Sequence, residues 1–514
     1  MSRRSRRIDT PADRTAGVSP RPAGSWPDRL LEGAAALLAL TVIARLAVFA
    51  TGARLTSDEC FHAWMSEWIA AHGTLPATVE GLYGGFKYFY PPLFHLLGAL
   101  AVRLFGAPAF HELNVVLLAA LFAATWFALA RMYSRATAAI AVLALAAYPG
   151  LVLQGVRLYV ECLSAALAVG MVLALLATGQ RPTRTRAVLL GVLAGLGVLA
   201  KQSGLIALPV LGALALLALW SGRREHVVAY ALALAVACAL AAPYWIRNAA
   251  LFGSPLYPVF GRDLDPRLLE LNVKGFSPGW GRFFTATLQQ AGWIVPALVG
   301  AGLAIAAVSR RSLEHPLLLG GALLLALAPR VPMLDSRHAI PLVAVLVVLS
   351  AVTVAGALER AVVARRTLLA ALLAVTAWGV VTLPNLRSGL NLAASMDEVW
   401  AAIRANVPRD ETILCIQTYD TFYYTGRRAT WPIPWGQVDP PVEMFDEKDP
   451  ATILAQLRRH RIDWLLVPTV ARATVFNSAN FPYGFMLGLQ RLGEQGKLDY
   501  VWGRRDLALL HVKR

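Results

Sequence analysis

The segment LEGAAALLALTVIARLAVFATGARLTSDECFH, residues 31–62, decides the fold class of this chain. Residues 31–50 are apolar and long enough to span a bilayer as one helix. About eight residues later come two adjacent carboxylates, Asp58 and Glu59, in a chain with 31 acidic and 48 basic residues. A carboxylate held partly desolvated at a membrane surface can act as a base, whereas the same pair in a solvated loop turn has no chemical role. Position alone leaves both interpretations open.

The composition of the whole chain is that of a polytopic membrane protein. Hydrophobic residues make up 57% of the 514 residues, charged residues only 15%, and the mean hydropathy is +0.55. The net charge of +17 is compatible with nucleic-acid binding, but the basic residues come in short clusters between apolar runs. That pattern is typical of cytoplasmic loops, so no nucleic-acid partner is expected. The four cysteines show neither disulfide nor zinc-site spacing.

The apolar runs predict about eleven membrane spans. The stretch 187–220 is too long for one span and is interrupted at Lys201-Gln202-Ser203-Gly204, so we interpret it as a helical hairpin. The other predicted spans are 31–50, 113–130, 136–153, 158–178, 227–246, 290–308, 316–328, 339–357 and 367–383.

Charge distribution predicts the orientation of these spans. Arginines at residues 3–7 place the N-terminus in the cytoplasm by the positive-inside rule. Two predicted spans separate each consecutive pair of later basic clusters, so all of them can be cytoplasmic together. This requires that the apolar stretch Leu93–Phe105, too short to span comfortably, lies at the outer interface. The acid pair then faces outward. The clusters are Arg131 with Arg135, Arg181 with Arg184 and Arg186, Arg223 with Arg224, Arg310 with Arg311, and Arg360 with Arg365 and Arg366.

Three regions follow from the pattern along the chain. Residues 1–29 are rich in Pro and Arg and are expected to be a disordered cytoplasmic segment. Residues 30–389 are expected to form the transmembrane domain, with an outer loop at 51–112. Residues 390–514 are expected to form a small soluble α/β domain outside the membrane. Its predicted helices are Asp397–Asn406 and Ala451–His460, and its predicted strands are Thr412–Gln417, Trp464–Val467 and Leu507–Val512.

Two outer segments carry polar residues whose role has more than one interpretation. Lys87 and Tyr90 precede Pro91-Pro92, which is either a simple helix-start signal or a device that holds these side chains over the acid pair. Glu161 opens a predicted span four residues after Arg157. Arg157 could simply neutralise this carboxylate on a shared helix face, or the acid could be functional, as acids at the mouths of spans often are.

Cations on the same predicted side could bind an anion. Lys201 lies at the outer turn of the hairpin, where it either reaches to the interface or binds a phosphate with help from the following helix N-terminus. Arg337 and His338, at the outer end of a later span, could supply a second cation. The remaining histidines show no helical or metal-like spacing and are interpreted as ordinary polar or interfacial residues; they include His62, His95, His111 and His315.

These motifs in this order resemble the membrane glycosyltransferases of the C-type fold, the family-39-like group of protein O-mannosyltransferases and the aminoarabinose transferase of lipid A. The resemblance covers roughly residues 30 to 345, and it rests on the order and shared sidedness of motifs that are each weak alone. The motifs are Asp58-Glu59, Tyr90-Pro91-Pro92-Leu93, Arg157-Leu158-Tyr159-Val160-Glu161, Gly197-Val198-Leu199-Ala200-Lys201 and Arg337-His338-Ala339-Ile340-Pro341.

The resemblance implies a transferase that moves a sugar from a polyprenyl-phosphate donor to an acceptor hydroxyl at the outer face of the plasma (inner) membrane, with inversion. It implies that Asp58 is the general base, that Glu59 or Glu161 orients hydroxyls, and that cations stabilise the departing phosphate, whose charge grows in the transition state. The residues assigned to the donor phosphate are Lys201, Arg337 and Arg157, and those assigned to substrate binding are Tyr90, Lys87 and His338.

Departures from the family pattern bear on the acceptor and on metals. Phe61 and Tyr90 stand where the lipid A enzyme carries cationic residues, and Glu161 replaces an aspartate, which argues against lipid A as acceptor. The acceptor is left open as a glycan, a lipid or a protein. Some relatives with this fold need a divalent metal. In this chain only the pair Asp58 and Glu59 could hold one, and no other cofactor is expected.

Two other classes of function compete with the transferase. A transporter or flippase for a lipid-linked or envelope substrate would suit about eleven spans, but transporters generally gather polar residues near the bilayer midplane. Here the polar residues gather at one face. A non-catalytic assembly protein would explain the outer domain, but it gives no reason for Asp58, Glu161 and Lys201 to share a side.

Overall fold

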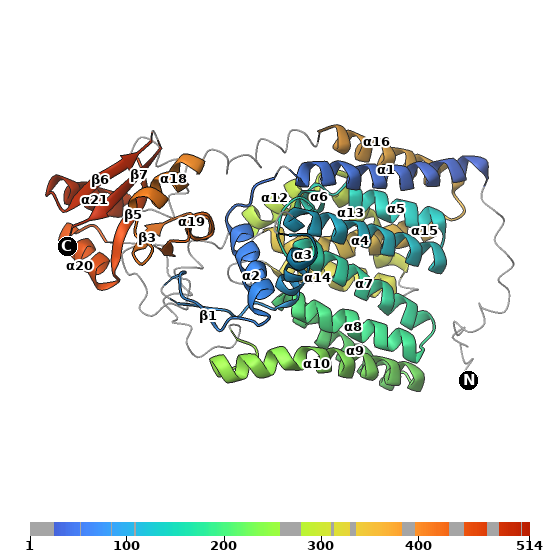
Figure 1. The fold of residues 1–514 in the computed structure, drawn as a ribbon. Coiled ribbons are helices and arrows are strands. Elements are labelled where there is room, and N and C mark those ends of the chain that lie inside the picture. Colours follow the sequence, from blue (N-terminus) through green and yellow to red (C-terminus); the bar gives the residue numbers. More distant parts are fainter. Residues whose placement is uncertain are drawn as a thin grey trace, which may run out of the picture.

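A computed structural model describes residues 25–51, 53–83, 85–106, 109–257, 279–309, 313–328, 336–382, 396–430, 447–469, 483–504 and 506–513. Most of the predicted disordered segment 1–29 lies outside these ranges, as do the predicted domain boundary at 389 and the cluster of Arg310 and Arg311. The described chain has two parts, a bundle of apolar helices and a C-terminal α/β domain beyond one end of it (Figure 1).

The bundle confirms a polytopic membrane protein. Seven described helices are long and apolar enough to cross a membrane, or eight if the pair α12 (Gly279–Ala291) and α13 (Ile294–Ser309), bent by 106°, is one span. Shorter apolar helices take the places of the other predicted spans. The bundle comprises α1 (Trp26–Ala50), α4 (Phe110–Met132), α5 (Arg135–Ala146), α7 (Glu161–Gln180), α8 (Arg184–Ala200), α9 (Ala207–Trp220), α10 (Arg224–Phe252), α13, α14 (Glu314–Leu327), α15 (Ile340–Ala357) and α16 (Val362–Thr382).

Small residues let the inner helices pack closely. Every residue from Ala136 to Ala146 of α5 is buried, and α15 is almost as enclosed, whereas α1, α9 and α16 expose leucine, valine and tryptophan side chains. Association of helices in lipid depends on such close contact, because apolar side chains gain little by leaving lipid for protein. At Gly191 of α8, an added Cβ would lie 2.4 Å from the carbonyl oxygen of Ala233 in α10, so only glycine fits there.

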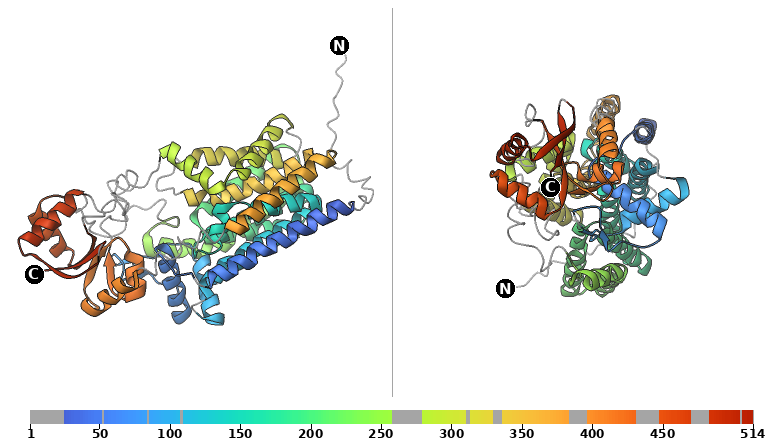
Figure 2. Two further views of the ribbon diagram at one scale, coloured as in Figure 1. Left: turned by 90° about the horizontal axis from the view of Figure 1, so that it is seen from above. Right: turned by 60° about the vertical axis from the view of Figure 1, so that its left-hand side comes forward.

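Two helices lie across the end of the bundle that faces the C-terminal domain. They are α2 (Asp58–His72) and α3 (Leu93–Phe105), and Figures 1 and 2 show α2 crosswise to the long axis of α1. The helix α3 has the predicted bounds, and its placement at the membrane interface stays a prediction, whereas α2 was not predicted. Between them, β1 (Thr78–Val79) and β2 (Phe86–Lys87) pair antiparallel. We call this end of the bundle the site end.

The hairpin prediction is confirmed. The helix α8 ends at Ala200, Lys201 has extended backbone with φ −154° and ψ 145°, and a 3-10 turn, η3 (Gln202–Ile206), leads into α9. Another short helix, α6 (Pro149–Gln154), and the 3-10 turn η5 (Ser336–Ala339) precede α7 and α15 respectively.

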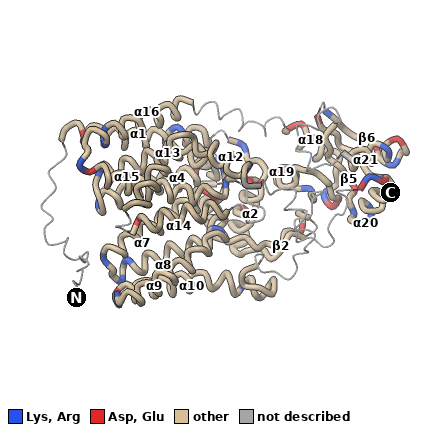
Figure 3. Tube along the Cα trace, turned by 180° about the vertical axis from the view of Figure 1, so that it is seen from behind, with Lys and Arg blue, Asp and Glu red and all other residues tan. Residues whose placement is uncertain are grey.

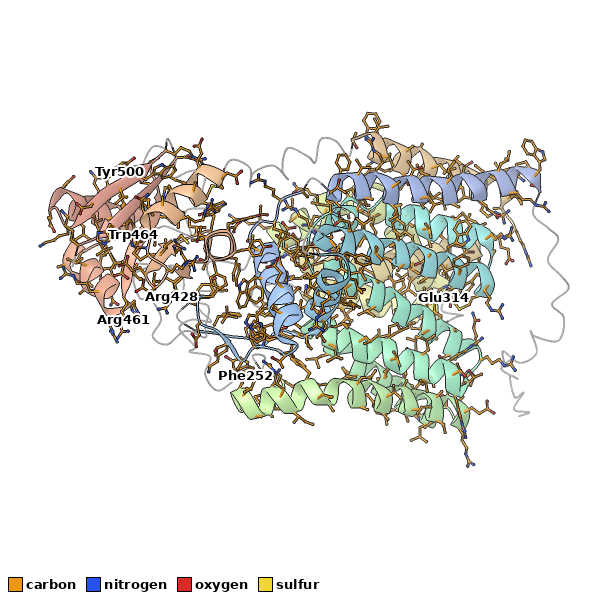
Figure 4. The ribbon with its side chains drawn as sticks, viewed as in Figure 1. Phe252, Glu314, Arg428, Arg461, Trp464 and Tyr500 are labelled. Atoms are coloured by element: carbon orange, nitrogen blue, oxygen red, sulfur yellow. The ribbon has the colours of Figure 1, made fainter. Side chains whose placement is uncertain are left out.

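The basic clusters gather at the opposite end of the bundle (Figure 3). There Arg366 Nε lies 2.9 Å from Asp28 Oδ1 at the start of α1, and Arg186 donates to the carbonyls of Ala177 and Arg181. Glu314 also lies toward this end, whereas Phe252 lies at the site end (Figure 4). The described clusters therefore share one end, as the charge parity predicts.

The C-terminal domain contains a five-stranded mixed sheet with strand order β4-β3-β5-β7-β6. Strand β3 is parallel to β4 and β5, and β7 is antiparallel to β5 and β6. Strand side chains alternate between two cores, with Leu414 and Leu465 in one and Ile413 and Trp464 in the other. Its elements are α18 (Asp397–Asn406), β3 (Thr412–Cys415), α19 (Thr418–Thr425), β4 (Arg428–Thr430), α20 (Pro450–Arg459), β5 (Ile462–Pro468), α21 (Tyr483–Glu494), β6 (Leu498–Gly503) and β7 (Leu507–Val512).

Candidate active site

The acid pair occupies the first turn of α2, at the site end. Free N–H groups at a helix N-terminus stabilise negative charge, so two adjacent carboxylates are tolerated there. The preceding residue, Ser57, has φ 54° and ψ −127°, a positive-φ conformation that costs energy for a residue other than glycine. Its N–H donates a 2.9 Å hydrogen bond to Asp420 Oδ2 of the C-terminal domain. The strained turn at Ser57 therefore fixes the start of α2 and the position of its two acidic residues.

Asp58 forms an ion pair with a cation from a distant part of the chain. Arg337 Nη2, in η5, lies 2.6 Å from Asp58 Oδ2, and the two side chains remain 26% and 33% exposed. The Arg337 guanidinium also lies over the ring of Tyr159, 4.8 Å from its centroid. Asp58 is therefore partly desolvated but still accessible to a substrate.

Glu59 is fully buried and bound by protein groups on both oxygens. Oε2 accepts hydrogen bonds from Arg157 Nη1 at 2.9 Å and from the Thr56 hydroxyl at 3.0 Å, and Oε1 accepts from Leu158 N at 2.8 Å. These contacts tie the start of α2 to the segment between α6 and α7. In this arrangement Glu59 positions its neighbours.

Glu161 forms its ion pair with Lys201, and not with Arg157, as one of the two interpretations of the sequence predicted. The helix α7 begins at Glu161, so Arg157 precedes the helix, shares no helix face with Glu161, and binds Glu59 instead. Lys201 Nζ lies 2.9 Å from Glu161 Oε1, and the two side chains are 19% and 3% exposed. Lys201 lies at the break between α8 and α9, and its side chain points to the buried Glu161 carboxylate.

The remaining predicted site residues lie in neighbouring elements. Tyr90 packs against Phe61, with ring centroids 5.2 Å apart, and lies within electrostatic reach of Asp58. Burial raises the pKa of the Tyr90 hydroxyl, so it stays neutral and able to donate a hydrogen bond. His338 acts electrostatically on Glu161. Lys87 lies in β2 opposite Thr78 of β1, and its part in the site stays a prediction.

A buried histidine pair behind the acids was missed by the sequence analysis. His62 Nδ1 and His95 Nε2 are 2.7 Å apart, and His95 Nδ1 is 2.7 Å from the Tyr88 hydroxyl. Burial lowers the pKa of His62 to about 4 and that of His95 well below its ordinary value, so both rings are neutral at pH 7. The interpretation of these two histidines as ordinary polar or interfacial residues did not include this pair. Spacing gives no signal, because the partners come from α2, α3 and the loop between them.

Helix α19 of the C-terminal domain also reaches the site. The Tyr419 ring lies 5.2 Å from that of Phe61, and burial raises the pKa of the Asp420 carboxyl to about 6. No catalytic motif marks this domain in the sequence. Only the folded arrangement reveals that it borders the acid pair.

The titration of Asp420 gives a pH-dependent prediction. The pKa of Asp420 in the folded protein lies above its ordinary value of 3.8, because the ionised carboxylate is unfavourable when buried. Asp420 therefore destabilises the fold above about pH 6, where it is ionised, and has no such effect below about pH 4, where it is protonated in both states. Asp420→Asn removes the buried charge and should stabilise the protein by about 3 kcal/mol at pH 7.5. Thermal unfolding of both proteins at pH 4 and 7.5 tests this. A lower Tm for the variant at pH 7.5 would contradict it. The titratable groups that interact electrostatically with Asp420 include Glu59, Asp58, Cys60, Cys415 and Tyr424.

The acid pair, the only group in the sequence that could hold a divalent metal, does not suit one in this arrangement. Asp58 binds Arg337, while both oxygens of Glu59 are taken by Arg157, Thr56 and Leu158. Among the residues that the structure describes, no group of three His, Cys, Asp or Glu side chains could hold a metal ion.

Solved structures with similar folds are membrane enzymes. The chain is similar to ArnT from Cupriavidus metallidurans, solved with undecaprenyl phosphate, with a TM-score of 0.62 and 14% identity over 92% of this chain and 97% of that one. It is also similar to the oligosaccharyltransferase AglB from Archaeoglobus fulgidus, solved with an inhibitory peptide and a dolichol-phosphate, with a TM-score of 0.61 and 14% identity over 86% and 70%. A third structure, of the same oligosaccharyltransferase tethered to an acceptor peptide with an NVT sequon, has a TM-score of 0.64 and 13% identity over 88% and 72%.

These likenesses confirm the C-type glycosyltransferase fold that the motifs predict, and at such low identity they show the fold alone. No curated protein matches the chain by sequence. A family model does match, over residues 1–331, and the chain therefore belongs to DUF6541, a family of unknown function.

Proposed function

We propose that this protein is a glycosyltransferase that moves a sugar from a polyprenyl-phosphate donor to an acceptor hydroxyl, with inversion, at the outer face of the plasma membrane. One observation carries the proposal. Three carboxylates, each paired with its own cation, gather at the site end, and Asp58 is the most exposed of the three. The fold neighbours solved with undecaprenyl phosphate or a dolichol-phosphate support the class of donor.

Asp58 is the proposed general base. It takes the proton of the acceptor hydroxyl while the acceptor oxygen attacks the anomeric carbon and the bond from that carbon to the phosphate oxygen breaks. The bonding electrons leave with the polyprenyl phosphate. A positioned carboxylate is suited to this step, because it removes the proton as the new glycosidic bond forms and its charge moves onto the departing phosphate.

Arg337 and Lys201 are proposed to stabilise that phosphate. Arg337 binds Asp58 through one guanidinium nitrogen and is 26% exposed, so an incoming phosphate can compete for it. When Arg337 turns to the phosphate, it leaves the Asp58 carboxylate free to take the proton of the acceptor hydroxyl. Lys201 lies on the same side and is held by Glu161. Donor binding and activation of the base are coupled in this scheme.

The buried acids are proposed to position these groups. Glu59 fixes Arg157 and the start of α2, and Glu161 fixes Lys201 in the absence of donor. Tyr90, Lys87 and His338 are proposed to contact the sugar or the acceptor. A neutral Tyr90 hydroxyl suits a sugar, because it can donate a hydrogen bond to a sugar hydroxyl, and the buried Phe61 ring packs against Tyr90 and supports it.

The arrangement favours a transferase over a transporter. Transporters generally place broken helices and binding residues near the bilayer midplane. Here the break between α8 and α9 brings Lys201 to the site end, where it joins Glu161. The inner helices α5 and α15 are instead packed with buried apolar side chains. The polar residues suit chemistry at a membrane surface.

We propose an extracytoplasmic site end and a cytoplasmic N-terminus, and surface labelling tests this orientation. Ala77→Cys, before α3, and Phe105→Cys, at the last residue of α3, should both react with an impermeant maleimide in intact cells. Arg223→Cys, between α9 and α10, should react only after permeabilisation. The native cysteines give little background, because Cys60, Cys162 and Cys415 are buried. Labelling of residues 77 and 105 from opposite faces would contradict the interfacial placement of α3.

A further inference from the structure

The C-terminal domain holds two strained turns of the outer loop. Among the described residues, only Ser57, Tyr83 and Arg461 adopt positive φ without being glycine, and two of these lie in the loop that carries the acid pair. Ser57 N donates to Asp420 Oδ2 at 2.9 Å, and Tyr83 N donates to the Ala429 carbonyl at 3.0 Å. Each strained residue therefore has its amide bound by the C-terminal domain.

These two contacts belong to a close-packed junction. The Phe422 ring lies 5.1 Å from that of Trp64, the Tyr423 hydroxyl donates to Glu67 Oε1 at 2.9 Å, and the Tyr424 hydroxyl donates to the Leu55 carbonyl at 2.8 Å. Leu82 also forms a parallel bridge with Ala429 of β4. The junction therefore includes α2, the loop after it, α19 and β4.

A strained backbone persists only where its surroundings hold it, because each such residue has a cost in conformational energy. A hydrogen bond from an amide to a carboxylate is strong enough to offset that cost. Asp420 is 8% exposed and lies on α19, a helix anchored by the contacts above. Ser57 immediately precedes Asp58, so any relaxation of its φ would rotate the start of α2 and move the Asp58 carboxylate relative to Arg337.

We propose that Asp420 is a positioning residue for Asp58. By accepting the Ser57 N–H, it holds the strained positive-φ turn at the start of α2, so the C-terminal domain sets the geometry of the site at the site end of the bundle. This inference rests on the proposed role of Asp58 as base. It gives the C-terminal domain a function in the reaction without requiring it to touch the substrate.

Four variants of the full-length protein test the proposal. Asp420→Ala removes the acceptor, and Asp420→Asn keeps an acceptor oxygen. Ser57→Gly combined with Asp420→Ala removes the acceptor but also the strain, because glycine adopts positive φ freely. Tyr423→Phe is the matched control, because it removes a different hydrogen bond of α19 and leaves Ser57 untouched.

Hydrogen–deuterium exchange across residues 55–61 is the first readout, because it requires no activity. The Ser57 amide should exchange at least tenfold faster in Asp420→Ala, and at the wild-type rate in Asp420→Asn and Tyr423→Phe. An unchanged rate in Asp420→Ala overturns the proposal, whether or not the protein transfers a sugar. If the wild type transfers none, the proposed function fails while this exchange result stands.

Transfer kinetics with labelled undecaprenyl-phosphate sugars and an envelope extract give the second readout. A displacement of about 1 Å in a catalytic group can cost a hundredfold in rate. Asp420→Ala should therefore lower kcat by about 10- to 100-fold and leave the donor KM within about threefold, and Ser57→Gly should restore part of that loss. Asp420→Asn and Tyr423→Phe should stay within about threefold of the wild type. Equal losses in Asp420→Ala and Tyr423→Phe would instead indicate loose docking of the domain and would overturn the proposal.

Discussion

Asp58→Asn should lower sugar transfer by roughly a thousandfold while leaving the protein folded in the membrane. Asparagine has the shape of aspartate and keeps an oxygen that can accept the hydrogen bond from Arg337, which lies 2.6 Å from Asp58 in the native protein. It cannot take up the proton of an acceptor hydroxyl. The loss should therefore appear in kcat, with a small effect on the donor KM.

Purified protein given labelled undecaprenyl-phosphate sugars and an envelope extract provides the measurement. Glu80→Gln, an exposed acid in the same outer loop, is the matched control and should transfer at the wild-type rate. Thermal unfolding of both variants checks the fold. Full transfer by Asp58→Asn would remove Asp58 as the base.

Replacement of Lys201 should have the second-largest effect, on both stability and donor use. Lys201→Met leaves the Glu161 carboxylate, 3% exposed, without its cation. An unpaired buried charge of this kind typically costs about 3–5 kcal/mol. The single variant should therefore unfold more easily, which would obscure its effect on catalysis.

A second substitution separates the two effects. In Lys201→Met with Glu161→Gln the buried charge is gone, so stability should return to near the wild-type value. Transfer should still be reduced by about a hundredfold or more, because loss of one group that stabilises developing charge typically has this cost. Undecaprenyl-phosphate sugar titrations of kcat and KM provide the measurement. Normal donor kinetics in the stable double variant would show that Lys201 has no role at the phosphate.

The elements that the sequence predicted well depend on local patterns. Apolar length marked the bundle helices, and a polar interruption marked the break at Lys201. The bounds of the helix Leu93–Phe105 match the predicted apolar stretch, and its placement at the outer interface stays a prediction from its length and the charge parity. Alternating helix-like and strand-like stretches marked the C-terminal α/β domain, although not the order of its strands.

The partners in the site were harder to predict, because they depend on packing between distant elements. Arg157 lies four positions before Glu161 but binds Glu59, since α7 begins only at Glu161. His62 and His95 are 33 positions apart and meet only because α2 packs on α3. Asp420 lies in a domain without a catalytic motif and reaches Ser57 from 363 positions away.

If the site end carries out transfer, the bond between a sugar and a polyprenyl phosphate breaks there. The measurement uses wild-type protein in nanodiscs, supplied with labelled undecaprenyl-phosphate sugars and an envelope extract. We expect free undecaprenyl phosphate and a glycosylated acceptor to appear in equal amounts, and both to be lost in Asp58→Asn. In sealed vesicles, movement of the intact lipid-linked sugar between leaflets, with no release of undecaprenyl phosphate, would contradict a transferase and indicate a transporter.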